Sequence, residues 1–170
     1  MNDRADIYIF LSYTTREEEV RQVRPFVKEI VARLRARGYG ECIDPLVWWD
    51  ADRIGPLNID LRTVLAEAIA RCRHLLAFVS PSYWQSCWCR FEWEQAFQHH
   101  VRDPRRRLVP ILWKGEPDIS LWEPVPPWRS LGYVDASHPY GWWNTPSQLP
   151  EDMPRIVNEV LRGLGEPPIY

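Results

Sequence analysis

Residues 75–96 read LLAFVSPSYWQSCWCRFEWEQA, and this stretch decides the fold class. It begins with a continuous apolar run, residues 75–79, which Ser80-Pro81 closes. An uninterrupted apolar run is typical of a strand covered on both faces of a sheet, since a half-exposed strand alternates apolar and polar residues. A helix is expected to follow at about residues 86–101. A strand and then a helix form the repeating unit of a parallel sheet.

The same kind of apolar run recurs on both sides of this stretch. Residues 7–11 and 108–112 are predicted to be two further buried strands, and residues 131–134 a weaker one. For the remaining strand two assignments stay open: Val47-Trp48-Trp49, which we favour, and Cys42-Ile43. Five strands that alternate with helices predict an α/β fold in which helices cover both faces of a mainly parallel sheet.

Helical periodicity predicts the segments between the strands. Residues 20–34 carry apolar side chains at helical spacing, behind residues 15–18, which fit a capping box. Gly38 and Gly40 are expected to end this helix, and Pro25 either kinks it or opens its main part after a short first turn. Two further helices are expected, one at residues 61–69 and one with Pro154 in its first turn. Their expected buried stripes are Leu61, Val64, Leu65, Ala68, Ile69, Ile156, Val157, Val160, Leu161 and Leu164.

The composition indicates a single domain. With 170 residues, 45% of them hydrophobic, we expect one domain over residues 1–170, with its core at about 5–165 and a Trp- and Pro-rich segment, 113–150, packed on it. The formal net charge of −2 and the lack of any apolar segment of about 20 residues favour no nucleic-acid partner, no membrane partner and a cytoplasmic location. The three arginines at 105–107 are interpreted as a solvated turn.

The four cysteines are too scattered for a disulfide framework. Cys87-x-Cys89 has no second Cys or His pair at zinc spacing, and the adjacent His99 and His100 face apart on a helix. We therefore expect no metal site.

Ligands of an open parallel sheet bind at the carboxyl ends of the strands. The loops expected there are residues 12–16, 50–58 and 80–88. None of them contains GxGxxG or GxxxxGK[ST], so the sequence lacks the loops that cradle the phosphates of dinucleotides and nucleoside triphosphates.

A helix over residues 86–101 separates two neighbouring glutamates. At about 100° per residue, Trp88 and Glu92 share one face, with Cys89 close by, and Glu94 points away. Burial beside Trp88 raises the pKa of Glu92 and the helix N-terminus lowers it, and the sequence leaves this balance open. Glu92 and Trp88, at the mouth of the sheet, are the candidate site.

Four segments, in this order, resemble the bacterial type of TIR (Toll/interleukin receptor) domain. They are DIYIFLSY at 6–13, WWDADRIGP at 48–56, LLAFVSPSYWQSCWCRFEWEQA at 75–96 and LVPILW at 108–113. The third is similar to the family's segment of a strand, Ser-Pro, an aromatic, Ser and Trp-Cys-x-x-Glu. The resemblance implies a flavodoxin-like three-layer sandwich with a central, mainly parallel five-stranded sheet.

Many TIR domains of this type cleave NAD+ at the nicotinamide–ribose bond. The resemblance therefore implies NAD+ as substrate, no bound cofactor, and Glu92 as the catalytic residue. Other TIR domains are the implied partners, and bacterial antiviral defence is the implied setting. The implied substrate contacts are Trp88, Ser12, Tyr13, Thr14, Thr15, Asp50, Ser80 and Tyr83, and the implied assembly loop is Asp52, Arg53, Ile54, Gly55 and Pro56.

Three functions stay open, of which we favour the first. An NAD+ glycohydrolase or cyclase, active on self-association, needs one carboxylate to stabilise an oxocarbenium-like transition state, because nicotinamide departs as a neutral base. A non-catalytic TIR adaptor is favoured by Thr14 and Thr15, which stand where the family's enzymes often carry an arginine. A flavodoxin-like or nucleoside-processing domain is disfavoured by the missing phosphate loop.

Overall fold

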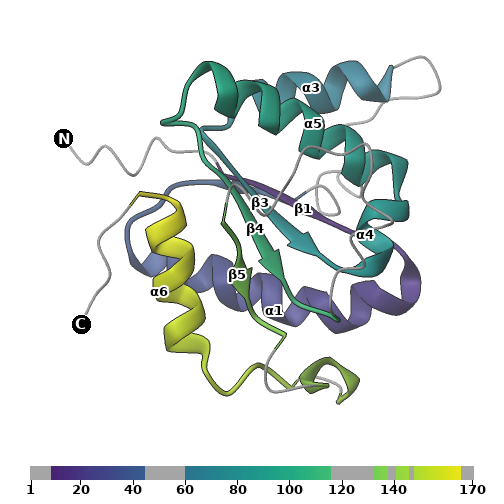
Figure 1. Ribbon diagram of the computed structural model, residues 1–170, viewed down its shortest axis with the longest axis vertical. Helices are drawn as coiled ribbons and strands as arrows, with labels where there is room; N and C mark the ends of the chain where they lie inside the picture. The colour runs from purple at the N-terminus through teal and green to yellow at the C-terminus, as the bar shows by residue number, and fades with distance from the viewer. Residues whose placement is uncertain (1–8, 45–59, 116–131, 138–140, 146–147, 166–170) are drawn as a thin grey trace.

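The centre of the protein is a five-stranded sheet. The computed structural model describes residues 9–44, 60–115, 132–137, 141–145 and 148–165. Every neighbouring pair of strands is parallel, and the spatial order is β2-β1-β3-β4-β5. The order of the first strands, 2-1-3, places the switch in strand order between β1 and β3, as in flavodoxin-like folds (Figure 1). The predicted α/β class with a parallel sheet is confirmed. The strands are β1 (Ile9–Tyr13), β2 (Cys42–Ile43), β3 (His74–Val79), β4 (Leu108–Leu112) and β5 (Val134–Asp135).

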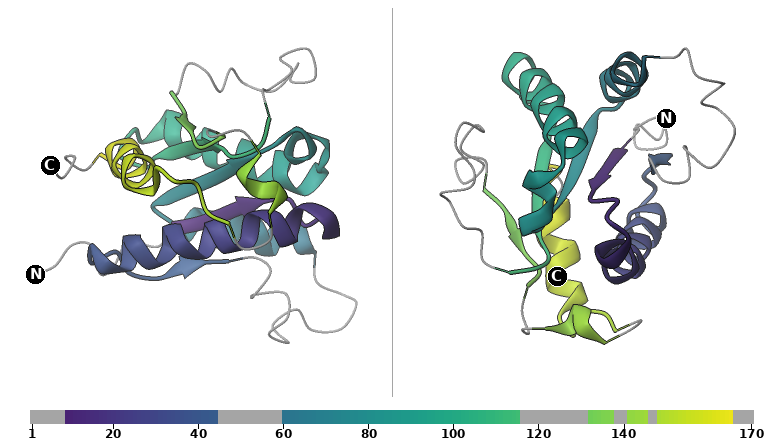
Figure 2. Two further views of the ribbon diagram at one scale, coloured as in Figure 1. Left: turned by 90° about the horizontal axis from the view of Figure 1, so that it is seen from below. Right: turned by 90° about the vertical axis from the view of Figure 1, so that its right-hand side faces the viewer.

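Helices cover both faces of this sheet, as the continuous apolar strands require (Figure 2). On one face, α1 (Glu17–Ala36) and α6 (Met153–Gly163) form a core with alternate residues of the strands, including Ile9, Leu11 and Tyr13. On the other face, α3 (Leu61–Arg71), α4 (Pro81–Gln85) and α5 (Cys87–Arg102) pack around Phe10 and the side chains that point that way. The sheet is thus the middle of three layers.

Helix α1 begins differently from the sequence prediction. The predicted capping box at residues 15–18 is wrong: the helix starts at Glu17, and the capping position, Arg16, makes no side-chain hydrogen bond to the helix. The Thr14 hydroxyl instead accepts a hydrogen bond from the Arg16 N–H at 3.3 Å. Thr14, two residues earlier in the chain, is therefore the side-chain acceptor in the tight turn after β1. Pro25 lies inside one continuous helix, which excludes a separate helix that begins there.

The end of α1 follows the sequence prediction. Gly38 has φ of 86°, a left-handed conformation that costs glycine little. The Gly38 N–H bonds to the Arg35 carbonyl and the Tyr39 N–H bonds to the Leu34 carbonyl, which is a Schellman motif. The chain then turns back to enter β2.

Three strand and helix assignments need correction or addition. Cys42-Ile43, the less favoured of the two candidates, is the strand that pairs with β1, because Ile9 and Phe10 align with it in register. Val47-Trp48-Trp49 lie outside the described residues. Strand β1 continues to Tyr13, two residues beyond the predicted end, since Ser12 and Tyr13 still pair with β3. The short helix α4, capped by the Ser80 side chain, was not predicted.

The described parts of the Trp- and Pro-rich segment pack on the body of the protein. Trp113 is buried at the end of β4, and Trp142 and Trp143 are buried in a short 3-10 helix, η3 (Trp142–Asn144). The Trp142 ring lies 5.2 Å from the Phe26 ring of α1, and its Nε1 donates to the Ala136 carbonyl. These aromatic contacts extend the core that α1 and α6 share.

Candidate functional site at the carboxyl edge of the sheet

The carboxyl ends of β1 and β3 lie next to one another, and α4 and α5 begin there (Figure 1). Strand alternation sorts the residues at the end of β1 between the two faces. Ser12 lies on the side of α5, where it meets Glu92, and Tyr13 lies on the side of α1, in the other core. Tyr13 donates to the Asp44 carboxylate at 2.5 Å. The two neighbours in sequence therefore take part in different hydrogen-bond groups.

Three side chains from three elements form a buried polar cluster. Ser12 of β1 donates from Oγ to Glu92 Oε2 of α5 at 2.5 Å. The Tyr83 hydroxyl of α4 lies 2.7 Å from Ser12 Oγ and 3.4 Å from the Cys89 carbonyl. Ser12 and Tyr83 are completely buried, and Glu92 is only 5% exposed. Serine, tyrosine and glutamate thus share one hydrogen-bonded chain that ends on a carboxyl group.

This chain satisfies Glu92 in both protonation states. When Glu92 is ionised, Tyr83 donates to Ser12 and Ser12 donates to the carboxylate. When Glu92 is protonated, its own hydroxyl donates to Ser12, Ser12 donates to Tyr83, and Tyr83 donates to the Cys89 carbonyl. Hydroxyl groups can reverse in this way because each is both a donor and an acceptor. The carboxyl group can therefore change its charge without leaving a buried polar group unpaired.

Burial decides the balance that the sequence left open. It raises the pKa of Glu92 to about 8, and the hydrogen bond from Ser12 opposes this shift without cancelling it. Burial, together with the charges of Cys89 and Glu92, also raises the pKa of the Tyr83 phenol well above its usual range. At neutral pH the site therefore holds Glu92 mostly protonated, which suits a group that ionises when a cation arrives.

The buried face of α5 differs from the predicted pair of Glu92 and Trp88. The buried residues of this helix are Cys89, Glu92, Trp93 and Ala96, spaced as one helical stripe. Trp88 lies at the edge of this stripe and is 36% exposed. The buried tryptophan of α5 is Trp93, whose ring lies 4.9 Å from that of Trp84. Glu94 is exposed, and its predicted separation from Glu92 is confirmed.

A second polar cluster, which the sequence did not indicate, lies beside the first. Glu19 Oε2, in the first turn of α1, accepts hydrogen bonds from Ser80 and Ser82 at the ends of β3 and α4. Lys114, just after β4, lies 3.7 Å from the other oxygen of Glu19. The cluster ties α1 to α4 and so fixes the helix that carries Tyr83. Ser80, an expected substrate contact, belongs to this cluster rather than to that of Glu92.

The remaining expected contacts are not all brought to Glu92. Thr14 is buried and holds the turn after β1, and Thr15 is exposed. Asp50, expected to contact the substrate, and the expected assembly loop, residues 52–56, lie outside the described residues. The structure thus brings together Glu92, Ser12 and Tyr83 from the expected set.

The described part of the chain shows no group of three or more His, Cys, Asp or Glu side chains placed to hold a metal ion. All four cysteines are free thiols. In the same described residues, the helices are too short or too polar to cross a membrane.

Comparison with known families gives a match over most of the chain. The family model described as TIR domain matches residues 9–148. This range contains all five strands, both polar clusters and Glu92.

Proposed function

We propose that this chain, which belongs to the TIR domain family, is an NAD+ glycohydrolase or cyclase in which Glu92 is the catalytic carboxylate. The observation that carries the proposal is the burial of Glu92 at the carboxyl edge of the sheet, where it is bonded to Ser12 and has a raised pKa. Strongly perturbed carboxyl groups at such an edge are typical of functional sites.

The chemistry needs only one carboxylate. Nicotinamide is a cationic pyridinium while it is attached to ribose, and it leaves as a neutral base, so no acid has to protonate it. Positive charge then develops on the ribose, and a carboxylate fixed in a dry site stabilises that charge strongly, because little water screens it. Glu92 would supply this carboxylate, and Ser12 would hold its orientation. The ribosyl cation then reacts with water, which gives ADP-ribose, or with an adenine nitrogen, which gives a cyclic product.

The substrate itself would set the charge of Glu92. A nearby cation favours the ionised form of a carboxyl group and lowers its pKa. Arrival of the pyridinium would therefore transfer the proton of Glu92 to solvent water, and the hydroxyl chain of Ser12 and Tyr83 would reverse to stabilise the carboxylate. Trp88, 36% exposed at the same end of α5, would stack on the nicotinamide ring.

The setting of this activity is part of the same proposal. Residues 52–56 would join two TIR domains and complete the site on self-association. The reaction would serve bacterial antiviral defence in the cytoplasm by depleting NAD+. The bacterial type of the domain rests on the resemblance of its sequence segments.

A second candidate function is a non-catalytic TIR adaptor that only recruits other TIR domains. The low exposure of Glu92 favours it, since the carboxyl group of the single chain is almost out of contact with solvent. Under this alternative, the cluster of Ser12, Tyr83 and Glu92 serves only to hold α4 and α5 on the sheet.

The deciding experiment compares Glu92→Gln with Glu94→Gln, a matched control on the exposed side of the same helix. Nicotinamide release from NAD+ is measured at high protein concentration with a crowding agent, so that self-association is favoured. We expect a loss of at least about a hundredfold for Glu92→Gln, the size typical of removing one group that stabilises transition-state charge, and full activity for Glu94→Gln. Full activity of a folded Glu92→Gln variant, or no NAD+ loss by the unmodified protein together with measurable self-association, refutes the proposal.

A further inference from the structure

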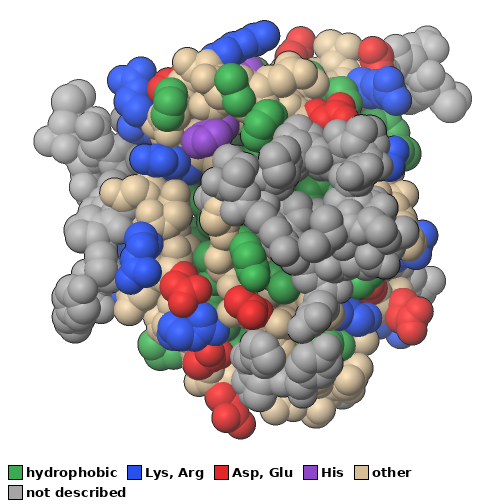
Figure 3. Space-filling view, in the orientation of Figure 1, with side chains coloured by type: hydrophobic (Ala, Val, Ile, Leu, Met, Phe, Trp, Pro, Cys, Tyr) green, Lys and Arg blue, Asp and Glu red, His purple; other side chains and the backbone are tan. Residues whose placement is uncertain are grey.

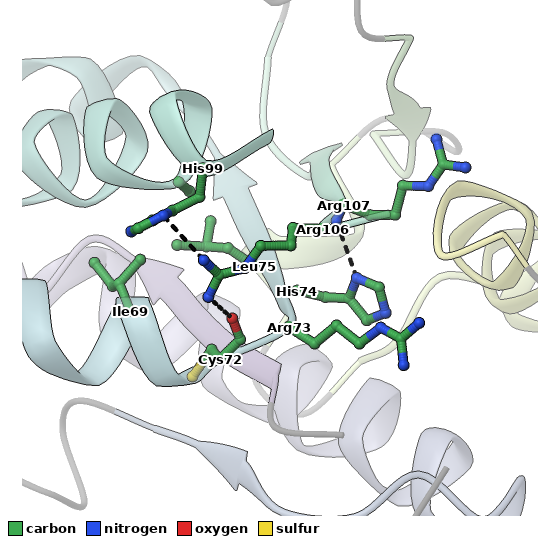
Figure 4. A pocket seen from close by; sticks show the side chains of 9 residues that line it. Ile69, Cys72, Arg73, His74, Leu75, His99, Arg106 and Arg107 are labelled. Atoms are coloured by element: carbon green, nitrogen blue, oxygen red, sulfur yellow. Dashed lines mark hydrogen bonds between the residues drawn. The ribbon is translucent and has the colours of Figure 1, made fainter. Parts of the chain in front are cut away.

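The opposite, amino-terminal edge of the sheet is strongly basic. Figure 4 shows a small pocket there, between the end of α3, the end of α5 and the starts of β3 and β4. Its volume is about 10 Å³, close to the minimum for one water molecule. The pocket is lined by Arg73, His74, Arg106 and Arg107 together with apolar side chains. Three arginines thus lie at an edge that is across the sheet from Glu92.

One of these arginines holds the fold together. Arg106 donates to the carbonyls of Ala70 and Cys72, which closes the end of α3, and its other nitrogen lies 2.9 Å from His99 Nδ1. Its hydrogen-bonding capacity is therefore mostly used inside the protein. It contributes positive charge to the edge rather than a free donor.

The other two arginines are Arg73 and Arg107. Within the described residues, neither Arg73 nor Arg107 pairs with an acid. Their side chains extend on either side of His74 in the same direction (Figure 4). His74 Nδ1 accepts from the backbone N–H of Arg107 at 3.0 Å, so the proton of the neutral imidazole is on Nε2. Burial, and then the charges of Arg73, Arg107 and Arg106, lower the pKa of His74 to about 4, so the ring stays neutral at pH 7.

Arg107 also lines a larger groove that continues from this edge. The groove has a volume of about 520 Å³ and lies between the end of α5, the start of β4, β5 and α6. Basic side chains and a histidine gather on the corresponding part of the face shown in Figure 3. The size falls in the range of small-molecule sites, which is far more room than one inorganic ion needs.

The groove offers two cations, an aromatic ring and an acid whose charge is already balanced. Arg107 and Arg162 line it, and neither forms an ion pair within the described part of the chain. Glu159 also lines it, but Arg155 holds that carboxylate at 2.8 Å. The Tyr133 ring is 45% exposed at the same groove. Free guanidinium groups bind phosphate oxygens in pairs, and a tyrosine ring provides a stacking surface for a base.

We propose that this groove is a nucleotide-binding site, separate from Glu92, in which Arg107 and Arg162 bind the phosphates and Tyr133 packs against the base. The inference does not depend on the proposed NAD+ cleavage, because no residue of the Ser12–Tyr83–Glu92 cluster lines the groove.

A purely structural role for the same arginines makes a different prediction. Both lie near the C-terminal end of α6, where cations complement the helix dipole: Arg162 is in its last turn, and the Arg107 guanidinium lies beside Gly165. If they act only in this way, Arg107→Ala/Arg162→Ala lowers the melting temperature and leaves anion binding unchanged. That outcome overturns the proposal.

The test measures binding of AMP, inorganic phosphate and inorganic pyrophosphate by titration calorimetry. None of these ligands has a nicotinamide–ribose bond, so NAD+ cleavage cannot consume them, and the failure of either proposal is visible by itself. We expect AMP to bind more tightly than phosphate, Arg107→Ala/Arg162→Ala to weaken AMP and pyrophosphate at least tenfold, and Tyr133→Ala to abolish the advantage of AMP. Added salt is expected to weaken pyrophosphate binding, since the site is open to solvent.

Arg21→Ala/Lys28→Ala is the matched control, because it removes two positive charges from exposed positions on α1. We expect this variant to bind AMP as the parent does. Equal weakening in the control, equal affinities for AMP and phosphate, or no binding by the parent each overturns the proposal. So does tighter binding of a single-stranded oligonucleotide than of AMP, since the partner is then a nucleic acid.

Discussion

The two edges of the sheet bury titratable groups with opposite results. At the carboxyl edge, burial raises the pKa of Glu92 to about 8, and the acid is bonded to Ser12, which is bonded in turn to Tyr83. At the amino edge, burial lowers the pKa of His74 to about 4, and arginines surround the base. One force acts at both places: loss of water disfavours the charged form of either group. Each edge therefore holds a group that is neutral near pH 7: Glu92 becomes charged at higher pH, and His74 becomes charged at lower pH.

The largest predicted effect is on the pH dependence of catalysis. If the ionised form of Glu92 is the active one, kcat/KM for NAD+ rises with pH and levels off above about 8, because kcat/KM reports the pKa of the free enzyme. Between pH 6 and pH 8 the rise would be about fiftyfold, because only half of Glu92 is ionised when the pH equals its pKa. Initial rates of nicotinamide release on the self-associated protein measure it. A profile that is flat from pH 6 to 8 contradicts this role of the raised pKa.

The second effect is on stability at the carboxyl edge. The folded protein binds the Glu92 proton more tightly than the unfolded chain does, so this group's contribution is complete below pH 4.5 and is lost as pH rises towards about 8. The loss is about 1.4 kcal/mol per pH unit. Glu92→Gln removes this dependence, so its melting temperature is expected to gain on the parent from pH 5 to pH 8.5. Thermal melts that stay parallel over this range would show that the carboxyl group is not held neutral.

The third effect has the opposite sign and tests the amino edge. The unfolded chain binds the His74 proton more tightly, so this group's contribution is complete above pH 6.5 and is lost as pH falls towards about 4. At pH 5 the loss amounts to about 2 kcal/mol, at about 1.4 kcal/mol per pH unit. His74→Gln keeps an acceptor for the Arg107 N–H and is expected to flatten the acid side of the stability curve. Denaturant melts from pH 4.5 to 7 measure it, and an unchanged acid slope argues against a neutral His74.

The smallest effect concerns the link between α1 and α4. Glu19→Ala removes the carboxylate that accepts from Ser80 and Ser82, and leaves both hydroxyls without this partner. We expect a loss of about 1–3 kcal/mol in the free energy of unfolding, typical of unpaired buried polar groups. Glu18→Ala, at an exposed position one residue earlier, is the control, with an expected change within about 0.5 kcal/mol. Similar losses of unfolding free energy in the two variants would show that Glu19 does not stabilise the carboxyl edge.

Much of the fold can be predicted from local patterns in the sequence. The apolar runs that became β3 and β4 and the stripe that became α3 are visible in the sequence because burial on a sheet or under a helix selects consecutive or periodic apolar residues. Strand β2 is harder to predict, because two residues are too few to show a periodicity. Only pairing with Ile9 and Phe10 identifies Cys42-Ile43 as a strand. The capping box failed because the turn after β1 uses Thr14 as its local acceptor instead.

The candidate site, too, was predicted only in part from the sequence. Helical spacing is enough to separate Glu92 from Glu94, and the alternation of strands and helices is enough to predict Glu92 at the carboxyl edge. The sequence did not show that Trp93, rather than Trp88, would be buried in the same stripe as Glu92, because the position of that stripe depends on which face of α5 meets the sheet. The sequence also gave no sign that Glu19 has a structural role. Glu19 is one of three consecutive glutamates, and only the packing of α1 against α4 distinguishes it from the other two.

The sequence by itself determined most elements of this protein, with the exceptions of β2 and α4, and also the parallel sheet and the helix position of Glu92, because these follow from the periodicity of side chains near one another in the chain. Only the tertiary structure decided the charge of Glu92 and the use of Ser12 and Tyr83 as its partners. Both depend on the water that packing excludes and on contacts between residues 71 and 80 positions apart, which no local pattern records.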